Sequence, residues 1–138
     1  MVSLPSLRRV PASVEAVGAL VEWIGACARE VGLPEPRAAG LEVAVEEALV
    51  NVCSHAYPPP TSGAVRVGAS VSASGFTVEI RDEGVPFDPL AAAAPDVLAP
   101  LEERPNGGLG IHFLKRFTDE VTYRRAGEEN LLTLTVRL

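Results

Sequence analysis

Sulfur-containing and aromatic residues are scarce in this sequence. Its 138 residues include two cysteines, one methionine and one tryptophan, and aromatic side chains make up 5% of the chain. Two cysteines are too few for a disulfide scaffold in a chain of this length. We therefore expect an aliphatic core, with Cys27 and Cys53 as small buried helix residues in a reducing compartment.

Positive charge and long apolar runs are also lacking. The chain carries 12 basic against 18 acidic residues, a formal net charge of -6. This balance argues against nucleic acid as a partner, because a protein that binds the phosphate backbone needs a basic face. No run reaches the roughly 20 apolar residues of a membrane helix, and the start has no signal-peptide core. These absences predict a soluble, cytoplasmic protein without nucleic-acid or membrane partners.

The patterns that are present predict one compact domain over residues 1–138 that begins with two helices. Apolar residues recur at helical spacing from Ser13 to Val31, with Ser13 as the expected cap and Gly32 as the stop. The spacing returns between about Pro34 and Ala56, and the three prolines after Tyr57 end this second helix.

The rest of the chain predicts a sheet. Apolar and polar residues alternate from Gly63 to Ile80, and Ser74-Gly75 interrupts them as a hairpin turn would. We expect a third helix over Gly108 to Phe117, and strands over Glu120 to Arg125 and Leu131 to Leu138 that are joined at Gly127. The order helix, helix, strand, strand, loop, helix, strand, strand predicts an α+β two-layer sandwich, a mainly antiparallel sheet with helices on one face.

One stretch resists assignment to regular structure. Between Glu83 and Asn106 the chain contains five prolines, and only Leu90 to Ala94 is expected to form a short helical turn. Loops of this length in compact domains are usually functional or mobile.

Three polar residues are spaced by four on the second predicted helix: Glu47, Asn51 and His55. That spacing places them on one ladder. A carboxamide oxygen suits a magnesium ion that keeps water and phosphate ligands, and a carboxylate can accept a proton from a hydroxyl. A solvated helix face gives the same pattern, but asparagine is a poor mid-helix residue without another role. His55 lies near the helix end, where capping is at least as good an explanation.

The alternation of the second strand stops at Asp82, and Gly84 follows two residues later. An ordinary turn explains this pair. The functional interpretation is that the carboxylate accepts a hydrogen bond from an exocyclic amine such as that of adenine, while glycine lets the backbone approach the base.

A glycine-rich segment opens the later helix, with Gly107, Gly108 and Gly110 around Leu109. Backbone amides at such a helix start can hold phosphate, although a flexible linker is the alternative. The segment matches neither of the two common phosphate-loop motifs.

In their order along the chain, these three clusters resemble the N, G1 and G2 boxes of the gyrase, histidine-kinase and MutL-type ATPases, which share the Bergerat-type ATP-binding fold. Four segments more closely resemble the bacterial anti-sigma-factor serine kinases: Glu47 to Asn51, His55 to Tyr57, Asp82 to Pro89, and Gly107 to Ile111.

The resemblance assigns roles to these residues. It implies that Glu47 is the general base, Asn51 the magnesium ligand and Asp82 the reader of adenine. The remaining ATP contacts that it implies come from His55, Gly84, Phe87, Gly107, Gly108, Leu109 and Gly110.

The resemblance also implies a lid over the triphosphate near residues 88–107, with Arg104 as a cation for the γ-phosphate. Pro86 stands in the region where the family often has a second glycine, so a stiffer lid hinge is expected.

The predicted function is that of an ATP- and Mg²⁺-dependent serine/threonine kinase that phosphorylates a STAS-type anti-anti-sigma protein, with a sigma factor as a second partner. The carboxylate of Glu47 favours serine as acceptor, because a hydroxyl must lose its proton whereas a neutral imidazole need not. The apolar first helix and the resemblance favour a homodimer. One alternative is a non-catalytic switch that binds a regulator when ATP orders its lid. The other is an ATPase clamp, but such proteins usually carry a transducer domain, for which this sequence has no length.

Overall fold

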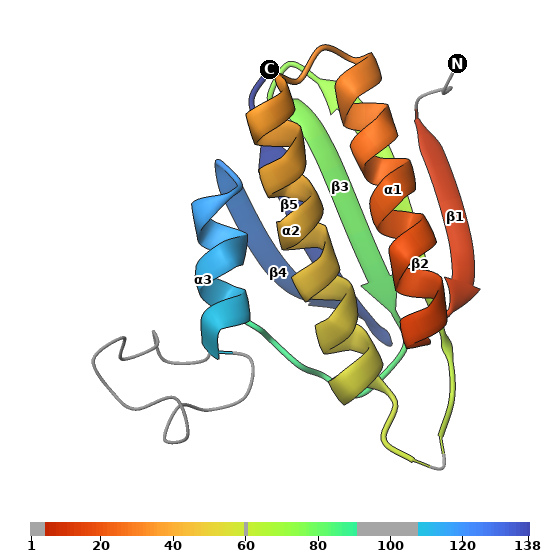
Figure 1. The fold of residues 1–138 in the computed structure, drawn as a ribbon. Coiled ribbons are helices and arrows are strands. Elements are labelled where there is room, and N and C mark those ends of the chain that lie inside the picture. The colour runs from red at the N-terminus through yellow and green to blue at the C-terminus, as the bar shows by residue number, and fades with distance from the viewer. Residues whose placement is uncertain (1–4, 60, 91–107) are drawn as a thin grey trace.

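The computed structural model describes residues 5–59, 61–90 and 108–138, which form two layers, a sheet and a set of helices (Figure 1). The elements in chain order are β1 (Ser6–Pro11), α1 (Val14–Glu30), α2 (Glu35–Asn51), the π-helix η1 (Val52–Ala56), β2 (Ala64–Ser72), β3 (Gly75–Asp82), α3 (Gly108–Arg116), β4 (Glu120–Ala126) and β5 (Glu129–Val136). No helix within the described residues is long and apolar enough to cross a bilayer.

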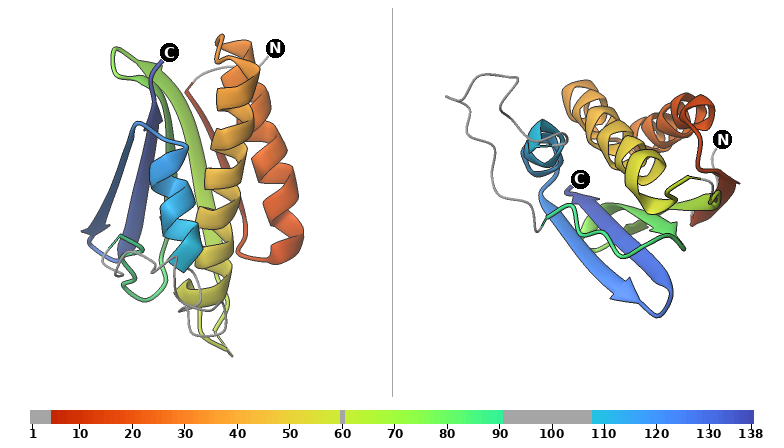
Figure 2. Two further views of the ribbon diagram at one scale, coloured as in Figure 1. Left: turned by 60° about the vertical axis from the view of Figure 1, so that its left-hand side comes forward. Right: turned by 90° about the horizontal axis from the view of Figure 1, so that it is seen from below.

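The five strands make one sheet in the order β1-β2-β3-β5-β4, and each neighbouring pair is antiparallel. All three α-helices lie on the same face of this sheet, as both views of Figure 2 show. The predicted α+β sandwich is therefore confirmed. The predicted order of elements was wrong at its start, because it lacked β1, which pairs with β2 and forms one edge of the sheet.

The core lies between the helices and the inward side of the sheet. Alternate strand residues point to the helices, since successive side chains of a strand face opposite sides. The largest fully buried side chains are aliphatic apart from one phenylalanine: Phe76, Leu20, Ile24, Leu41, Leu49, Ile80, Leu114, Leu134, Val45, Val67, Val78 and Val136. Each contributes about 1.5–3 kcal/mol by leaving water, which explains how a chain poor in aromatics builds a core.

The cysteines differ in burial. Cys27 is fully buried in α1, as predicted, but Cys53 lies in η1 and is only half-buried. Removal from water raises the pKa of both thiols, because burial disfavours the charged thiolate. The expectation of two buried cysteines was therefore wrong for Cys53, since the wider turns of η1 leave it at the margin of the core.

The ends of α1 follow the sequence signals in part. Gly32 adopts φ +99° immediately after the helix, a conformation that glycine tolerates and other residues rarely adopt. Ser13 occupies the N-cap position, but its side chain makes no capping hydrogen bond. The prediction of Ser13 as a capping side chain was therefore wrong, although the helix begins where it was expected.

The second predicted helix changes its winding at Asn51. The α-helical pattern ends there and five residues of π-helix follow, so the phase of the side chains shifts. The prediction of one regular ladder was therefore wrong at His55. Its ring instead stacks on Phe87, with centroids 4.6 Å apart and an interplanar angle of 19°.

Polar contacts outside the core tie the element ends together. Arg37 Nη2 at the start of α2 lies 2.5 Å from Asp119 Oδ2, which also accepts the Arg137 N–H at 2.7 Å. These contacts lower the pKa of Asp119, chiefly through the Arg137 N–H and then through Arg37. The pair of contacts joins α2 to the beginning of β4 and the end of the chain.

Candidate functional site

The polar clusters from α2 and β3 meet at one end of the sheet. Asn51, Asp82 and Phe87 line a single cavity of about 30 Å³, together with Asn130 on β5. The other walls are mostly apolar and are supplied by Ala48, Val52, Ala56, Ile80, Pro89, Tyr123 and Leu132. Two clusters that lie some 30 residues apart in the sequence therefore share one cleft between the helix layer and the sheet.

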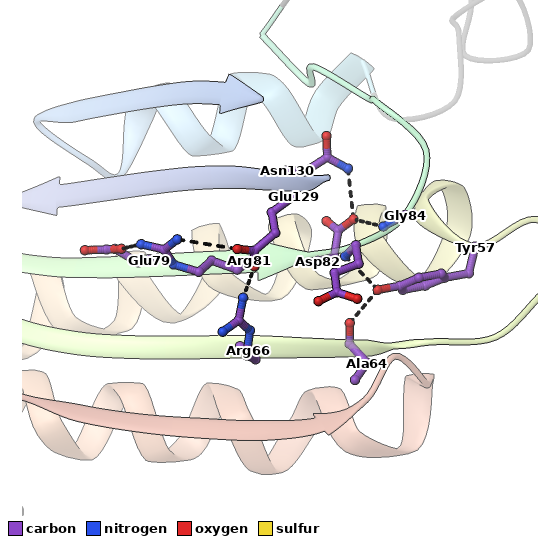
Figure 3. A network of polar contacts seen from close by, with 10 residues as sticks. Tyr57, Ala64, Arg66, Glu79, Arg81, Asp82, Gly84, Glu129 and Asn130 are labelled. Carbon is purple, nitrogen blue, oxygen red and sulfur yellow. Dashed lines mark hydrogen bonds and ion pairs between the residues drawn. The ribbon is translucent and has the colours of Figure 1, made fainter. Parts of the chain in front are cut away.

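Asp82 is the last residue of β3 and is 6% exposed (Figure 3). Its Oδ1 accepts the Gly84 N–H at 2.9 Å and the Asn130 Nδ2–H at 2.8 Å. Both hydrogen bonds go to Oδ1, so neither uses Oδ2. A buried carboxylate held on one oxygen can present the other to a donor, which is what recognition of an exocyclic amine requires.

Asn130 is a site residue that sequence reasoning missed. It is 5% exposed, and its Nδ2 donates to Asp82 Oδ1 and to the Val85 carbonyl, each at 2.8 Å. Its Oδ1 accepts the Tyr123 hydroxyl at 2.5 Å, and the Phe87 N–H and Arg125 Nη1 at 3.3 Å each. The signal that could have found it is the register, since Asp82 and Asn130 are direct partners across β3 and β5.

Gly84 permits a close approach between two backbones. A Cβ at this position would lie 2.1 Å from the Ala56 carbonyl oxygen, which no real side chain allows. The same oxygen accepts the Val85 N–H at 2.8 Å, so the turn after β3 is fixed to the end of η1. The close approach that the structure shows at Gly84 is therefore to the protein's own Ala56.

Tyr57 fixes the other side of this turn and was not predicted as a site residue. Its hydroxyl donates to the Ala64 carbonyl at 2.7 Å and accepts the Glu83 N–H at 2.9 Å (Figure 3). Burial raises the pKa of the phenol, because the charged phenolate would lose hydration. Tyr57 thus joins the end of η1 to the start of β2 and the end of β3.

The remaining predicted residues stand apart from this cavity or outside the described residues. Glu47 is half-buried on α2, one turn before Asn51, and is not among the described residues that line the cavity. His55, which stacks on Phe87, is not among them either. Gly108, Leu109 and Gly110 form the first turn of α3. Gly107, Arg104 and nearly all of the predicted lid and helical turn lie outside the described residues.

The chemistry of the cleft fits an adenine nucleotide with magnesium. Apolar walls with a carboxylate at one side suit a flat base that carries an amine, and Asn51 offers one neutral oxygen to a cation that takes its other ligands from phosphate and water. A cavity of about 30 Å³ is far smaller than a base, since one water already occupies about that share of liquid volume. Only part of a base could therefore lie within this cavity with the side chains as they stand.

Comparisons with known proteins identify the family of this chain. Residues 10–136 match the family model of the histidine kinase-like ATPase domain. The serine/threonine-protein kinase BtrW of Bordetella bronchiseptica is 30% identical over 69% of this chain and 67% of its own length. The anti-sigma F factor of Halalkalibacterium halodurans is 30% identical over 59% of this chain and 56% of its own length.

A solved structure supports the fold. The RsbU and RsbW domains of a Mycobacterium tuberculosis protein match with a TM-score of 0.65 at 18% identity, over 96% of this chain and 32% of that one. The family match covers almost the whole chain and the relatives are named as serine kinases and as an anti-sigma factor. This chain belongs to the histidine kinase-like ATPase family, as a member of its anti-sigma serine kinases.

Proposed function

We propose that this chain transfers the γ-phosphate of ATP to a serine of a STAS-type anti-anti-sigma protein, and that a sigma factor is its second partner. The observation that carries the proposal is the pairing of Asp82 with Asn130 in the cavity that Asn51 also lines. A base reader and a metal ligand on one cleft would hold the two ends of a nucleotide. The homodimer and the cytoplasmic location stay predictions, and sedimentation of the purified chain tests the first.

The chain's own residues would divide the work. Asp82 Oδ2 would accept the adenine amine, because Oδ1 already holds the Gly84 and Asn130 donors. The Asn51 carboxamide would hold magnesium, which when bound neutralises charge on the phosphate oxygens. The backbone amides of the first turn of α3, at Gly108 and Gly110, would hold the phosphates.

Glu47 would act as the general base. As the serine Oγ forms its bond to the γ-phosphorus, the bond to the β,γ-bridging oxygen breaks and ADP leaves, while the serine proton passes to the Glu47 carboxylate. Glu47 lies one helical turn before Asn51 and is half-buried, so the proposed base and the proposed metal ligand come from one helix.

A phosphotransfer assay with γ-labelled ATP and a purified STAS-domain protein tests the proposal. Glu47→Gln should lower the rate by about 100-fold or more while ATP binding persists. Glu46→Gln is the matched control, because the neighbouring Glu46 is exposed and loses the same charge. If the parent binds ATP but transfers phosphate to no STAS protein, the chain is a non-catalytic switch.

Binding assays test the two ends of the nucleotide separately. Asp82→Asn should weaken ATP binding in calorimetry, because an acceptor that faces an amine becomes a mixed donor and acceptor. Unchanged affinity would remove Asp82 as the base reader. Chelation of magnesium should weaken ATP binding in the parent and have a smaller effect in Asn51→Ala, if Asn51 is a ligand of the ion.

A further inference from the structure

The face of the sheet that the helices leave uncovered carries a row of arginines. Arg9 pairs directly with Arg66, and Arg66 pairs directly with Arg81 in the next strand. The row continues through Leu131 to Arg124, since both Arg81 and Arg124 are partners of Leu131. We name these five residues the arginine row. Figure 3 shows its central members, Arg66 and Arg81, beside Glu129.

The row faces away from the helices because of the strand period. The neighbours of its members, such as Val65 on β2 and Ile80 on β3, are buried under the helix layer, so Arg66 and Arg81 point to the opposite side. The arginine row is therefore separate from the nucleotide cleft, although both lie on β3 and β5.

Like charges directly opposite one another destabilise a sheet. Two glutamates offset part of this cost: Glu129 contacts Arg66 and lies 4.0 Å from Arg81, and Glu79 contacts Arg81 at 2.8 Å. Within the described part of the chain, Arg9 and Arg124 at the two sides of the row form no ion pair. Among the described residues, two of the four arginines on this face therefore have no carboxylate partner.

Three hollows follow the row. One of about 540 Å³ is lined by Arg9, Arg66 and Arg81, and one of about 470 Å³ by Arg81, Leu131 and Arg124. A third, of about 270 Å³, lies beside Arg66 and Arg81 toward the exposed Leu7. Glu83 also lines the first hollow, as do Ala56 and Asp82, which line the nucleotide cleft from the other side of the sheet. All three hollows border Arg81, two of them also border Glu79, and together we call them the groove.

The dimensions of the groove suit an extended peptide. Five strands at about 4.8 Å spacing put the outer members of the row about 19 Å apart, which is about six residues of extended chain at about 3.3 Å each. Arginine binds carboxylates through two parallel N–H bonds, so the planar guanidinium groups of Arg9 and Arg124 match carboxylate side chains.

We propose that the arginine row is the docking site for an acidic segment of a protein partner, which lies across the strands and pairs its carboxylates with Arg9 and Arg124. A second copy that docks with this same face is disfavoured as the occupant, because it would bring its own arginines against the row. Nucleic acid is disfavoured by the net charge of -6. The proposal does not depend on phosphotransfer.

The test uses a fluorescein-labelled hexaglutamate peptide and fluorescence anisotropy on the full chain. The parent should bind the peptide with an affinity that falls as salt rises, and Arg9→Glu with Arg124→Glu should weaken binding by at least about tenfold. Lys115→Glu with Arg116→Glu on α3 makes the same change in net charge on the helix face and should leave binding within about twofold. Arg9→Lys with Arg124→Lys should retain part of the affinity.

Four results would overturn the proposal. The first is that the parent does not bind hexaglutamate. The second is that the α3 control weakens binding as much as the row variant, which would indicate a general effect of net charge. The chain self-associates and the row variant abolishes that association, which would make a second copy the occupant. A single-stranded oligonucleotide binds the row more tightly than the peptide, which would make nucleic acid the occupant. A thermal unfolding midpoint and an ATP affinity equal to those of the parent show, for each variant, that the fold is intact.

Discussion

Replacement of Asn130 by leucine tests whether the nucleotide cleft is held together by this one buried side chain. Leucine has a similar size but can neither donate nor accept hydrogen bonds, so five polar contacts to Asp82, Val85, Phe87, Tyr123 and Arg125 end at once. Asp82 Oδ1 keeps the Gly84 N–H. Three groups lose the partner that the structure gives them: the Phe87 N–H, the Tyr123 hydroxyl and the Val85 carbonyl.

The magnitude follows from these losses. Each buried polar group without a partner costs about 1–3 kcal/mol, and all three groups are only partly buried, which places them near or below the lower end. The buried leucine returns part of the loss by the hydrophobic effect. We therefore expect the free energy of unfolding to fall by about 2 kcal/mol. With a urea slope of about 1–3 kcal/mol per molar, the unfolding midpoint should fall by about 1 M.

The assay is urea unfolding followed by circular dichroism, together with calorimetry of ADP binding to the folded variant. Affinity for ADP should fall by about tenfold, because Asp82 loses the donor that orients it. Thr133→Leu is the control, since Thr133 is half-buried on the same strand and faces the opposite side of the sheet. A midpoint and an affinity equal to those of the parent would refute the role given to Asn130.

Two further changes follow from other contacts. Gly84→Ala should lower the free energy of unfolding, measured by thermal unfolding, by about 1–3 kcal/mol, because the new methyl group meets the Ala56 carbonyl. Gly18→Ala is the control and should be neutral or stabilising, because Gly18 lies on a helix with open space around it. Equal effects of the two substitutions would argue against the close approach at Gly84. The lowered pKa of Asp119 stabilises the fold above the unfolded pKa of about 3.9, and this contribution disappears as pH falls through the folded pKa. Asp119→Asn should therefore lower the free energy of unfolding by about 1 kcal/mol or less at neutral pH, because the Arg37 contact is partly exposed. The free energy of unfolding of this variant should also fall less steeply than that of the parent as the pH is lowered. Urea midpoints measured across the acid range test this.

The sequence predicted the elements whose periodicity is strong. The helix from Val14 to Glu30 and the hairpin of β2 and β3 lie where the apolar spacing put them, because both patterns come from burial of one face. The glycine at 127 has φ +64° between β4 and β5, as a turn there requires. Local patterns determine such elements because each buries a periodic face against the same core.

The parts that failed depend on pairing between distant segments. β1 has the sequence Ser-Leu-Arg-Arg-Val-Pro, which shows little alternation, and it becomes a strand because β2 offers a partner. Asn130 follows a turn and two glutamates, so its sequence suggests a loop, and only the register with Asp82 shows its role. The π-helix at 52–56 has no strong local signal, and it ends where the Ala56 carbonyl turns to Val85.

The ends of β3 and β5 each carry two functions on adjacent residues. Asp82 and Asn130 point to the helix layer and form the nucleotide cleft, while Arg81 and Glu129 point to the open face and belong to the ion pairs of the arginine row. The two-residue period of a strand makes this division inevitable, because a side chain cannot reach both faces. Charge reversal at Arg9 and Arg124 therefore leaves the cleft intact, and substitution of Asn130 leaves the row intact. The nucleotide and docking proposals can thus fail independently, and loss of ATP binding in the row variant would contradict the separation of the two faces itself.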